Sequence, residues 1–212
     1  METSPTLHCF PGDTPSLSII LLADYLGVSL QTRFLKPVNA AEKMYKSSIS
    51  KKFPMLEVKE GDSNYLIERS IPIINHLIRS SKNQQFGELT GFSNALGDQN
   101  IDYINQTLLP PLLTLKAFKM SIIESDKKLE KRCANETVNA LKTLCSLLET
   151  QNESGLLKSD FLLFTIVRTC YDLEEIREKI IALSILKERW SLLSKDEKFA
   201  KLMTPHIIKE FL

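Results

Sequence analysis

The chain has 212 residues, of which 43% are hydrophobic and 25% charged, a composition typical of globular proteins and enough length for two compact domains. Its 27 basic and 26 acidic residues leave a net charge of +1, so no overall field attracts it to nucleic acid or to an anionic membrane. No apolar run approaches the roughly 18 residues that cross a bilayer, and the N-terminal residues do not resemble a secretory signal.

The four cysteines show no spacing typical of a metal site or a redox motif. Cys9, Cys133, Cys145 and Cys170 form no Cys-x-x-Cys pair and no Cys/His ligand pattern. Cysteines without these spacings are expected to be free thiols, buried in a protein from a reducing compartment. We therefore expect no metal ion, a cytoplasmic protein and no membrane partner.

The first elements of the chain predict a strand followed by a helix. Residues 6–10 (TLHCF) suit a short strand. Residues 15–26 carry an apolar run that predicts a helix, with Thr14 as the expected N-cap. Pro15 stands at the first helical position. Proline is tolerated there because the amide hydrogen that it lacks would have had no partner in the helix. Gly27 is expected to end this helix.

Three more strands and a second helix are predicted next. Residues 28–35 alternate like a strand, and a polar stretch follows at 38–49. Residues 55–60 and 65–68 are expected to be strands joined by the hairpin turn EGDSN. Residues 70–82 form a helix with a proline in its first turn. The predicted order is β-α-β, a loop, and then β-β-α.

After this helix the pattern becomes entirely helical. Two apolar stripes recur at helical spacing, and Pro110 and Pro111 are expected to bend the first of them. Residues 160–173 are apolar nearly all round, which predicts a helix buried in a bundle. Residues 182–193 and 195–203 predict two more helices. The first stripe is Ile101, Ile104, Leu108, Leu112 and Leu115, and the second is Leu129, Cys133, Thr137, Leu141, Leu144, Cys145 and Leu148.

These patterns predict two domains. Residues 1–82 form an α/β domain, residues 83–97 form a linker rich in Ser, Asn, Gly and Gln, and residues 98–212 form an all-α helical bundle. A short α/β domain followed by a longer helical one resembles the glutathione transferase superfamily, whose N-terminal domain is thioredoxin-like. The resemblance covers essentially the whole chain.

Two N-terminal motifs carry this resemblance. Phe53-Pro54-Met55-Leu56 matches the family's x-Pro-x-Leu, in which the proline is cis and precedes the third strand. The segment Leu66–Leu77 resembles the family's strand-to-helix sequence Leu-x-Glu-Ser-x-Ala-Ile. Here Arg69 stands in place of the acid.

A third motif lies in the helical domain. Residues 155–164 (GLLKSDFLLF) resemble the capping motif that helps this domain to fold, with Asp160 at the family's aspartate. Leu157 replaces the family's Ser or Thr three residues earlier, and Ser159 is the candidate that would cap instead.

Three further stretches resemble the translation-associated branch of the superfamily. Residues 15–27 resemble the first helix of the domain appended to valyl-tRNA synthetase, and residues 56–73 resemble the hairpin of the domain appended to methionyl-tRNA synthetase. Residues 186–202 (LKERWSLLSKDEKFAKL) resemble the Arg-Trp…Phe signature common in synthetase domains, in the scaffold proteins of the multi-synthetase complex and in elongation factor one gamma.

The resemblance implies that glutathione binding would need three determinants. First, a hydroxyl or thiol after the first strand must stabilise the thiolate of glutathione. The family positions for this group are occupied by Asp13 and Thr14, and an ionised Asp has no proton to donate. Cys9 lies one residue too early to take this role. The cis-proline must present backbone groups to the cysteinyl amide. An acid followed by Ser must bind the γ-glutamyl group at a helix N-terminus, and Arg69 would instead repel its ammonium. The residues that would bind glutathione in an active enzyme are Thr14, Pro54, Met55 and Ser70.

We therefore expect a non-catalytic interaction module of an aminoacyl-tRNA synthetase, most specifically the methionyl enzyme, or of its multi-synthetase complex, with no cofactor and no catalytic residue. By resemblance, it would bind other transferase-like domains of the translation machinery. Two alternatives stay open: a transferase that conjugates or reduces small electrophiles with glutathione, and a homodimeric or chaperone-like relative. The expected partner-binding residues are Arg69, Ile73, Asn75, His76, Leu77 and Arg189.

Other chemistry finds little support in the sequence. His8, His76 and His206 lack a catalytic partner at motif spacing, and no glycine-rich phosphate loop occurs. Residues 126–132 and 187–198 hold charges of both signs, which is typical of solvated helix faces, although a weak or indirect tRNA contact stays open.

Overall fold

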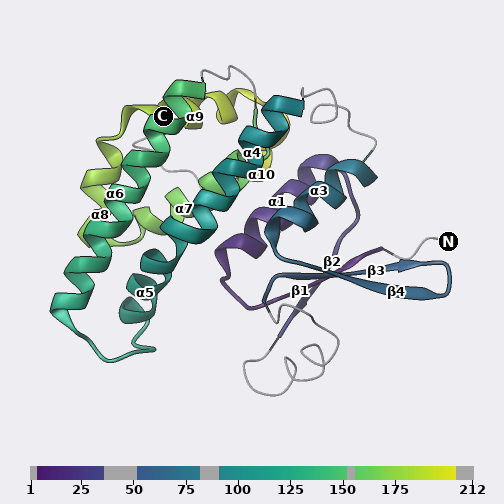
Figure 1. Cartoon of the computed structure of the whole chain (residues 1–212), viewed down its shortest axis with the longest axis horizontal. Coiled ribbons are helices and arrows are strands. Elements are labelled where there is room, and N and C mark those ends of the chain that lie inside the picture. Colours follow the sequence, from purple (N-terminus) through teal and green to yellow (C-terminus); the bar gives the residue numbers. More distant parts are fainter. Residues whose placement is uncertain (1–3, 36–51, 82–90, 152–155, 204–212) are drawn as a thin grey trace. The chain divides into compact units, whose positions relative to one another are not determined.

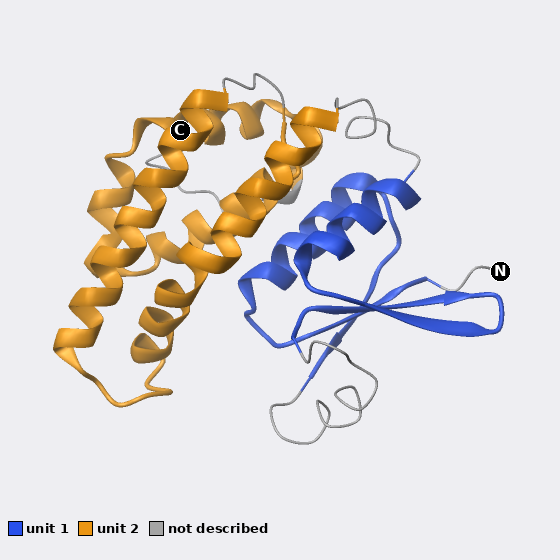
Figure 2. Cartoon of the chain, viewed as in Figure 1, with its two compact units in different colours: residues 1–89 blue, residues 90–212 orange. Residues whose placement is uncertain are grey.

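The chain divides into two units, residues 1–89 and residues 90–212 (Figure 2). The computed structural model describes residues 4–35, 52–81, 91–151 and 156–203. The first unit contains a mixed four-stranded sheet with helices, and the described part of the second is helical. The predicted fold class, a thioredoxin-like α/β domain followed by an all-α domain, is confirmed.

The sheet of the first unit has the strand order β2-β1-β3-β4 (Figure 1). Strand β1 pairs in parallel with β2 and antiparallel with β3, and β3 forms an antiparallel hairpin with β4. Both pairing modes and the position of the hairpin agree with the predicted element order. The predicted polar stretch at 38–49 lies outside the described residues. The strands are β1 (Thr6–Cys9), β2 (Gln31–Phe34), β3 (Met55–Glu60) and β4 (Ser63–Glu68).

Helices α1 (Thr14–Leu26) and α3 (Ser70–Ser80) lie side by side on one face of this sheet (Figure 1). Helix α1 ends at Gly27, as predicted, because Gly27 adopts a left-handed conformation with φ 72°. This turn lets the Val28 amide donate a hydrogen bond to the Ala23 carbonyl at 2.9 Å. The unit's core includes the fully buried side chains of Leu7, Cys9, Ile19, Leu22, Leu56, Ile73, Ile74 and Leu77.

The second unit is built around α7, whose apolar surface is covered on all sides. Its residues from Phe161 to Val167 are all buried, as the all-round apolar pattern predicts. Helix α8 (Glu174–Ile181), which is short and strongly charged, was not predicted from the sequence. No described helix is both long and apolar enough to cross a membrane. The helices are α4 (Gly91–Tyr103), η1 (Ile104–Leu108), α5 (Leu109–Lys119), α6 (Lys127–Gln151), α7 (Asp160–Tyr171), α8 (Glu174–Ile181), α9 (Ser184–Lys195) and α10 (Glu197–Met203).

The predicted bend before the two prolines takes the form of a π-helical turn, η1. The amide of Leu109 donates to the carbonyl of Ile104, five residues back, instead of four. Pro110 and Pro111 have no amide hydrogens to continue the ladder, and their rings crowd the preceding turn. The wider turn lies directly before the prolines, and the apolar stripe remains buried across it.

Helix α4 begins at Gly91, inside the segment 83–97 that was expected to be a linker. The glycines and asparagines of this segment have low helix propensity, so the sequence alone favours a loop. Tertiary packing overrides that preference. Gly97 is buried against the side chain of Lys158, and Asn100 exchanges two amide hydrogen bonds with Gln151 of α6, at 2.9 and 3.0 Å.

Replacing Gly27 with Ala is expected to lower the free energy of unfolding by about 1–2 kcal/mol, because a Cβ is disfavoured in the left-handed conformation. Chemical denaturation measures this change. Gly91→Ala is the matched control, since a Cβ at Gly91 would meet no atom of the described residues within 4 Å, its chain neighbours aside. A loss of stability at Gly91 equal to that at Gly27 would contradict this account.

Candidate functional site

The junction between β1 and α1 is organised by Asp13. Its carboxylate accepts a hydrogen bond from the Ser16 amide at 3.0 Å and another from the Ser16 hydroxyl. Asp13 is therefore the N-cap of α1, and the predicted cap at Thr14 is wrong. Thr14 is instead the first residue of the helix, and only 2% of it is exposed.

The thiol of Cys9, close to this junction, is not activated as a nucleophile. Cys9 lies at the end of β1 and is fully buried. Burial raises the pKa of the Cys9 thiol, and the nearby Asp13 carboxylate raises it further. A thiol with a raised pKa stays protonated at neutral pH, and only a thiolate is a strong nucleophile. All four cysteines are free and buried, as the sequence predicts.

The start of β3 and the start of α3 are joined through their backbones. The Phe53–Pro54 peptide bond is cis, as the resemblance implies. The Pro54 carbonyl accepts a hydrogen bond at 3.0 Å from the amide of Arg69, the residue that precedes α3. Met55 is fully buried beside Pro54. This connection brings the cis-proline and the N-terminus of α3 to one edge of the unit.

Arg69 has an unusual backbone conformation, with φ 70° and ψ 159°. Residues other than glycine rarely adopt it, and such strain is often found at functional sites. The Arg69 side chain is exposed and makes no capping hydrogen bond, while Ser70 is buried at the first position of α3. The helix N-terminus therefore presents a guanidinium where an acid would be needed to bind an ammonium.

Helix α3 exposes only part of the predicted partner surface. Arg69 is exposed, and Asn75 and His76 are half-buried. Partial burial lowers the pKa of His76, an effect that nearby Glu60 opposes. Ile73 and Leu77 are fully buried among the apolar residues of the unit, so their assignment to an exposed contact surface is corrected.

Comparison with solved structures places this geometry in a known fold. The structure is similar to glutathione transferase URE2P6 from Phanerochaete chrysosporium in complex with oxidized glutathione, with a TM-score of 0.78 at 16% identity over 96% of each chain. The chain has the glutathione transferase fold. It is also similar to Ure2p in complex with glutathione, with a TM-score of 0.76 at 12% identity over 95% of this chain and 99% of that one. The glutathione transferase from Ascaris lumbricoides gives a TM-score of 0.75 at 16% identity over 98% of this chain and 100% of the other.

Comparison of the sequence alone gives no match. No family model matches the chain, and no curated protein matches it. Since the structural neighbours share so little identity, they show the fold and do not define a function.

In the helical unit of this fold, Arg189 belongs to the core. It is 7% exposed, and its guanidinium donates two hydrogen bonds to the fully buried Asp160, one from Nε at 3.2 Å and one from Nη2. Trp190 packs on Phe164, with ring centroids 4.4 Å apart, and this confirms core packing of the indole. The interpretation of Arg189 as an exposed partner contact is therefore corrected.

Ser159 does not cap α7. Its hydroxyl is buried without a hydrogen-bond partner, whereas the Asp160 carboxylate accepts a bond from the Leu157 amide at 2.7 Å. Burial raises the pKa of Asp160, and the charge and hydrogen bonds of Arg189 oppose that effect. The Asp160 carboxylate thus joins the turn before α7 to an ion pair with α9, which the sequence could not reveal without the position of Arg189.

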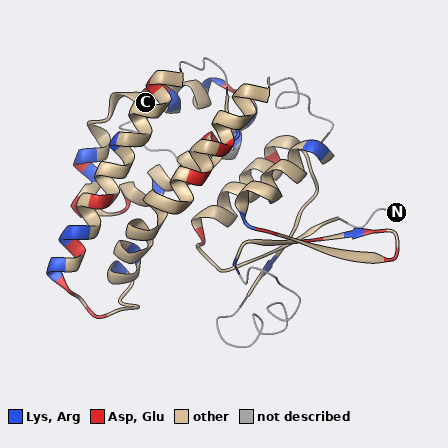
Figure 3. Ribbon diagram, viewed as in Figure 1, with Lys and Arg blue, Asp and Glu red and all other residues tan. Residues whose placement is uncertain are grey.

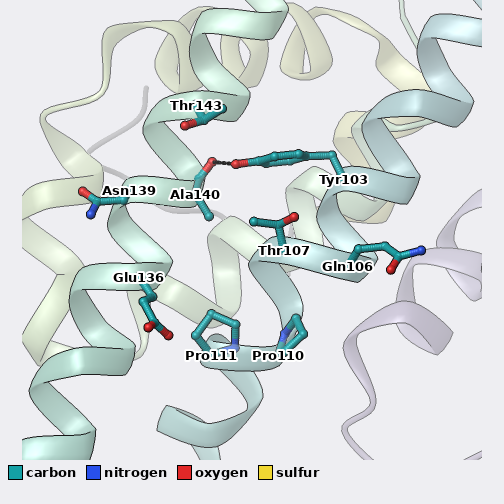
Figure 4. Close-up of a pocket in the computed structure, with 9 residues that line it drawn as sticks. All are labelled: Tyr103, Gln106, Thr107, Pro110, Pro111, Glu136, Asn139, Ala140 and Thr143. Atoms are coloured by element: carbon teal, nitrogen blue, oxygen red, sulfur yellow. Dashed lines mark hydrogen bonds between the residues drawn. The ribbon is translucent and has the colours of Figure 1, made fainter.

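A groove of about 510 Å³ runs between η1 and α6 in the helical unit (Figure 4). At one end of the groove, the Tyr103 hydroxyl donates a hydrogen bond to the Ala140 carbonyl at 3.3 Å. Pro110 and Pro111 lie toward the other end of the groove. Threonine and amide side chains line most of the remainder, and the one carboxylate, Glu136, is held by Arg132 at 2.7 Å. Among the described residues, no group of three or more His, Cys, Asp or Glu is placed to hold a metal. The groove therefore offers hydrogen bonds and no catalytic pair.

Replacing Arg189 with Leu is expected to lower the free energy of unfolding by about 3–5 kcal/mol, because Asp160 would remain buried without its counter-charge. Arg168→Leu is the control. Arg168 pairs with the exposed Asp172 at 3.0 Å, and loss of a pair this exposed should change stability by about 1 kcal/mol or less. Urea denaturation distinguishes the two. An equally small effect at Arg189 would contradict its structural role.

Proposed function

We propose that the chain is a non-catalytic module with the glutathione transferase fold, which binds another transferase-like domain of the translation machinery. Its place would be within or beside an aminoacyl-tRNA synthetase, methionyl-tRNA synthetase being the specific candidate, and it would act in the cytoplasm. The observation that carries the proposal is the β1–α1 junction, where the side chain available to a thiolate is the carboxylate of Asp13.

The chemistry of the junction argues against thiolate activation. A bound thiolate is stabilised by a hydrogen-bond donor, and an ionised carboxylate only accepts hydrogen bonds and repels an anion. Thr14 is almost entirely buried, and the Ser16 hydroxyl donates to Asp13. Cys9 is buried with a raised pKa. The junction is therefore suited to capping a helix.

The third determinant, an acid followed by Ser at the start of α3, is weakened for an electrostatic reason. Arg69 places a positive charge at the positive end of the α3 dipole, so the ammonium of a γ-glutamyl group would meet like charges. Ser70 keeps the family position at the helix N-terminus, but its hydroxyl cannot compensate for that charge. The scaffold remains while two of the three binding determinants are degraded.

Support for a partner in translation comes from the sequence of the β3–β4 hairpin and α3. Residues 56–73 resemble the corresponding hairpin of the methionyl-tRNA synthetase domain. Of the residues expected to bind a partner in this region, Arg69 is exposed, and Asn75 and His76 are half-buried. Arginine suits planar, bidentate contacts with a partner's carboxylate, which gives this surface a physical basis for specific docking.

A second candidate function is that of an active transferase, and the cis-Pro54 edge favours it. Pro54, Met55 and Ser70 occupy the positions expected of a glutathione site. Two of the similar structures were determined with bound glutathione or its oxidized form. This candidate requires a thiolate-stabilising group other than those at the β1–α1 junction.

We expect the purified protein to show no glutathione-dependent turnover of a generic aromatic electrophile and no retention on immobilised glutathione. Arg69→Glu should not create activity, because it restores one determinant and leaves Asp13 in place. Spectrophotometric turnover and calorimetric titration with glutathione measure both properties. Turnover by the unaltered protein would contradict the non-catalytic proposal and favour the transferase.

Partner binding is tested with purified transferase-like domains from the translation proteins of the same organism. The double change Arg69→Ala and His76→Ala should weaken binding at least tenfold, since the loss of one or two interface contacts commonly has that effect. Arg33→Ala, an exposed change on β2, is the control and should leave affinity unchanged. No binding by the unaltered protein, or unchanged binding by the double variant, would reject the surface.

A further inference from the structure

Strand β4 forms one edge of the sheet, because β3 is its only neighbour among the described strands. Edge strands present backbone amides and carbonyls that can pair with another chain, and proteins usually protect them by shortening the strand or by adding lysine, proline or a bulge. The other edge strand, β2, has only four residues and contains Arg33. Strand β4 has six residues and contains neither proline nor a basic residue.

Strand β4 is also regular and nearly uncharged. Its residues pair one to one with those of β3, so no bulge interrupts it. Glu68 is its only charged residue, and the strand is drawn tan over most of its length in Figure 3. Tyr65 is 54% exposed, and Leu66 and Ile67 are half-buried. The strand therefore combines an edge that lacks the usual protections with partly exposed apolar side chains.

The hydrogen bonds of the hairpin show which backbone groups of β4 point away from β3. The Arg69 amide donates to the Pro54 carbonyl, so the amide of Arg69 faces β3. Backbone groups alternate in direction along an antiparallel strand, so every second residue before Arg69 also faces β3, whereas Asn64 and Leu66 face outward. No hydrogen bond from another described residue reaches the outward groups of Asn64 and Leu66. These groups can pair with a further strand.

The sequence of β4 is complementary to itself in one antiparallel register. Hydrogen bonds form where outward-facing residues stand opposite each other, so Leu66 can pair with the same residue of a second copy. Tyr65 is then opposite Ile67, twice by symmetry, and an aromatic residue opposite a β-branched one stabilises a sheet. Asn64 is opposite Glu68, so no two like charges are opposite each other.

Other registers of the same two strands are less favourable. A shift of one residue would put outward-facing groups opposite inward-facing ones, and the hydrogen bonds would be lost. A shift of two residues toward the hairpin turn would put Asp62 opposite Glu68, and like charges in that position are destabilising. A shift of two residues the other way would leave only residues 66–68 of each strand paired. Pairing about Leu66 is therefore favoured.

We propose that β4 is a self-association edge, at which two copies of the chain pair their β4 strands antiparallel about Leu66 and join two four-stranded sheets into one. Such an interface is isologous, like that of most homodimers. The match of β4 to itself favours a second copy over an unrelated extended peptide. One strand from each copy is less than the roughly 20–30 residues of a standard interface, so we expect a weak, reversible dimer. This inference is independent of the proposed function, because it concerns copies of this chain alone.

Sedimentation velocity of the full chain at increasing concentration tests the proposal. The unaltered protein should form a dimer reversibly as its concentration rises. Leu66→Lys and Leu66→Glu should each weaken dimerisation by roughly tenfold or more, because each places like charges opposite each other on the symmetry axis. An equal mixture of the two variants should recover the dimer, since an introduced lysine then meets an introduced glutamate. Only a residue on the axis meets its own copy, so this recovery is specific to the proposed register.

Phe34→Lys is the matched control. Phe34 is 60% exposed on β2, at the opposite edge of the sheet, so its replacement should leave dimerisation unchanged. A protein that stays monomeric at every concentration would overturn the proposal, and so would undiminished dimerisation of either Leu66 variant or a mixture that does not recover. An equal loss in the Phe34 variant would also overturn it. Monomers that bind an alternating Thr-Val peptide would overturn it in favour of strand addition by another protein.

Discussion

The ion pair between Asp160 and Arg189 is the constraint on which the helical unit depends. A carboxylate without solvent is strongly disfavoured unless charge and hydrogen bonds compensate it, and here the guanidinium of α9 and the Leu157 amide do so. The pair connects α7 to α9 and to the turn before α7. Around it, Trp190 and Phe199 pack on Phe164. The Arg-Trp…Phe signature is therefore explained by packing within one unit, and it carries no information on a partner.

In the N-terminal unit, backbone geometry and side-chain chemistry are separable. The hydrogen bond from the Arg69 amide to the Pro54 carbonyl, and the unusual φ of Arg69, depend on the main chain. Neither feature uses the side chain of residue 69 as a hydrogen-bonding cap, so the acid of an active transferase can become an arginine without loss of the fold. The same holds at Asp13, because an aspartate caps α1 as well as a serine does. A fold that survives loss of its chemistry is consistent with its reuse for binding.

The sequence predicts those features that local physics dictates. Periodicity identified the strands and most helices, and Gly27 was placed correctly because the left-handed end of a helix favours glycine. The cis peptide bond before Pro54 was expected from the family resemblance. The partners of side chains could not be predicted. The ion pair of Arg189 with Asp160 joins residues 29 positions apart, and helix α4 forms in a glycine-rich segment through contacts such as that of Gly97 with Lys158. Both depend on tertiary packing that no local window contains.

Leu129 shows why an apolar stripe does not guarantee burial. It continues the helical spacing of Cys133 and Thr137, which are buried, yet it is 38% exposed. Helix α6 begins at Lys127, so Leu129 lies in its first turn, where a side chain can have the angular position of the stripe and still be partly uncovered. The periodicity reports the angle of a residue around the helix axis and contains no information on position along it. A residue that continues the stripe into the first turn of a helix can therefore be exposed, as Leu129 is.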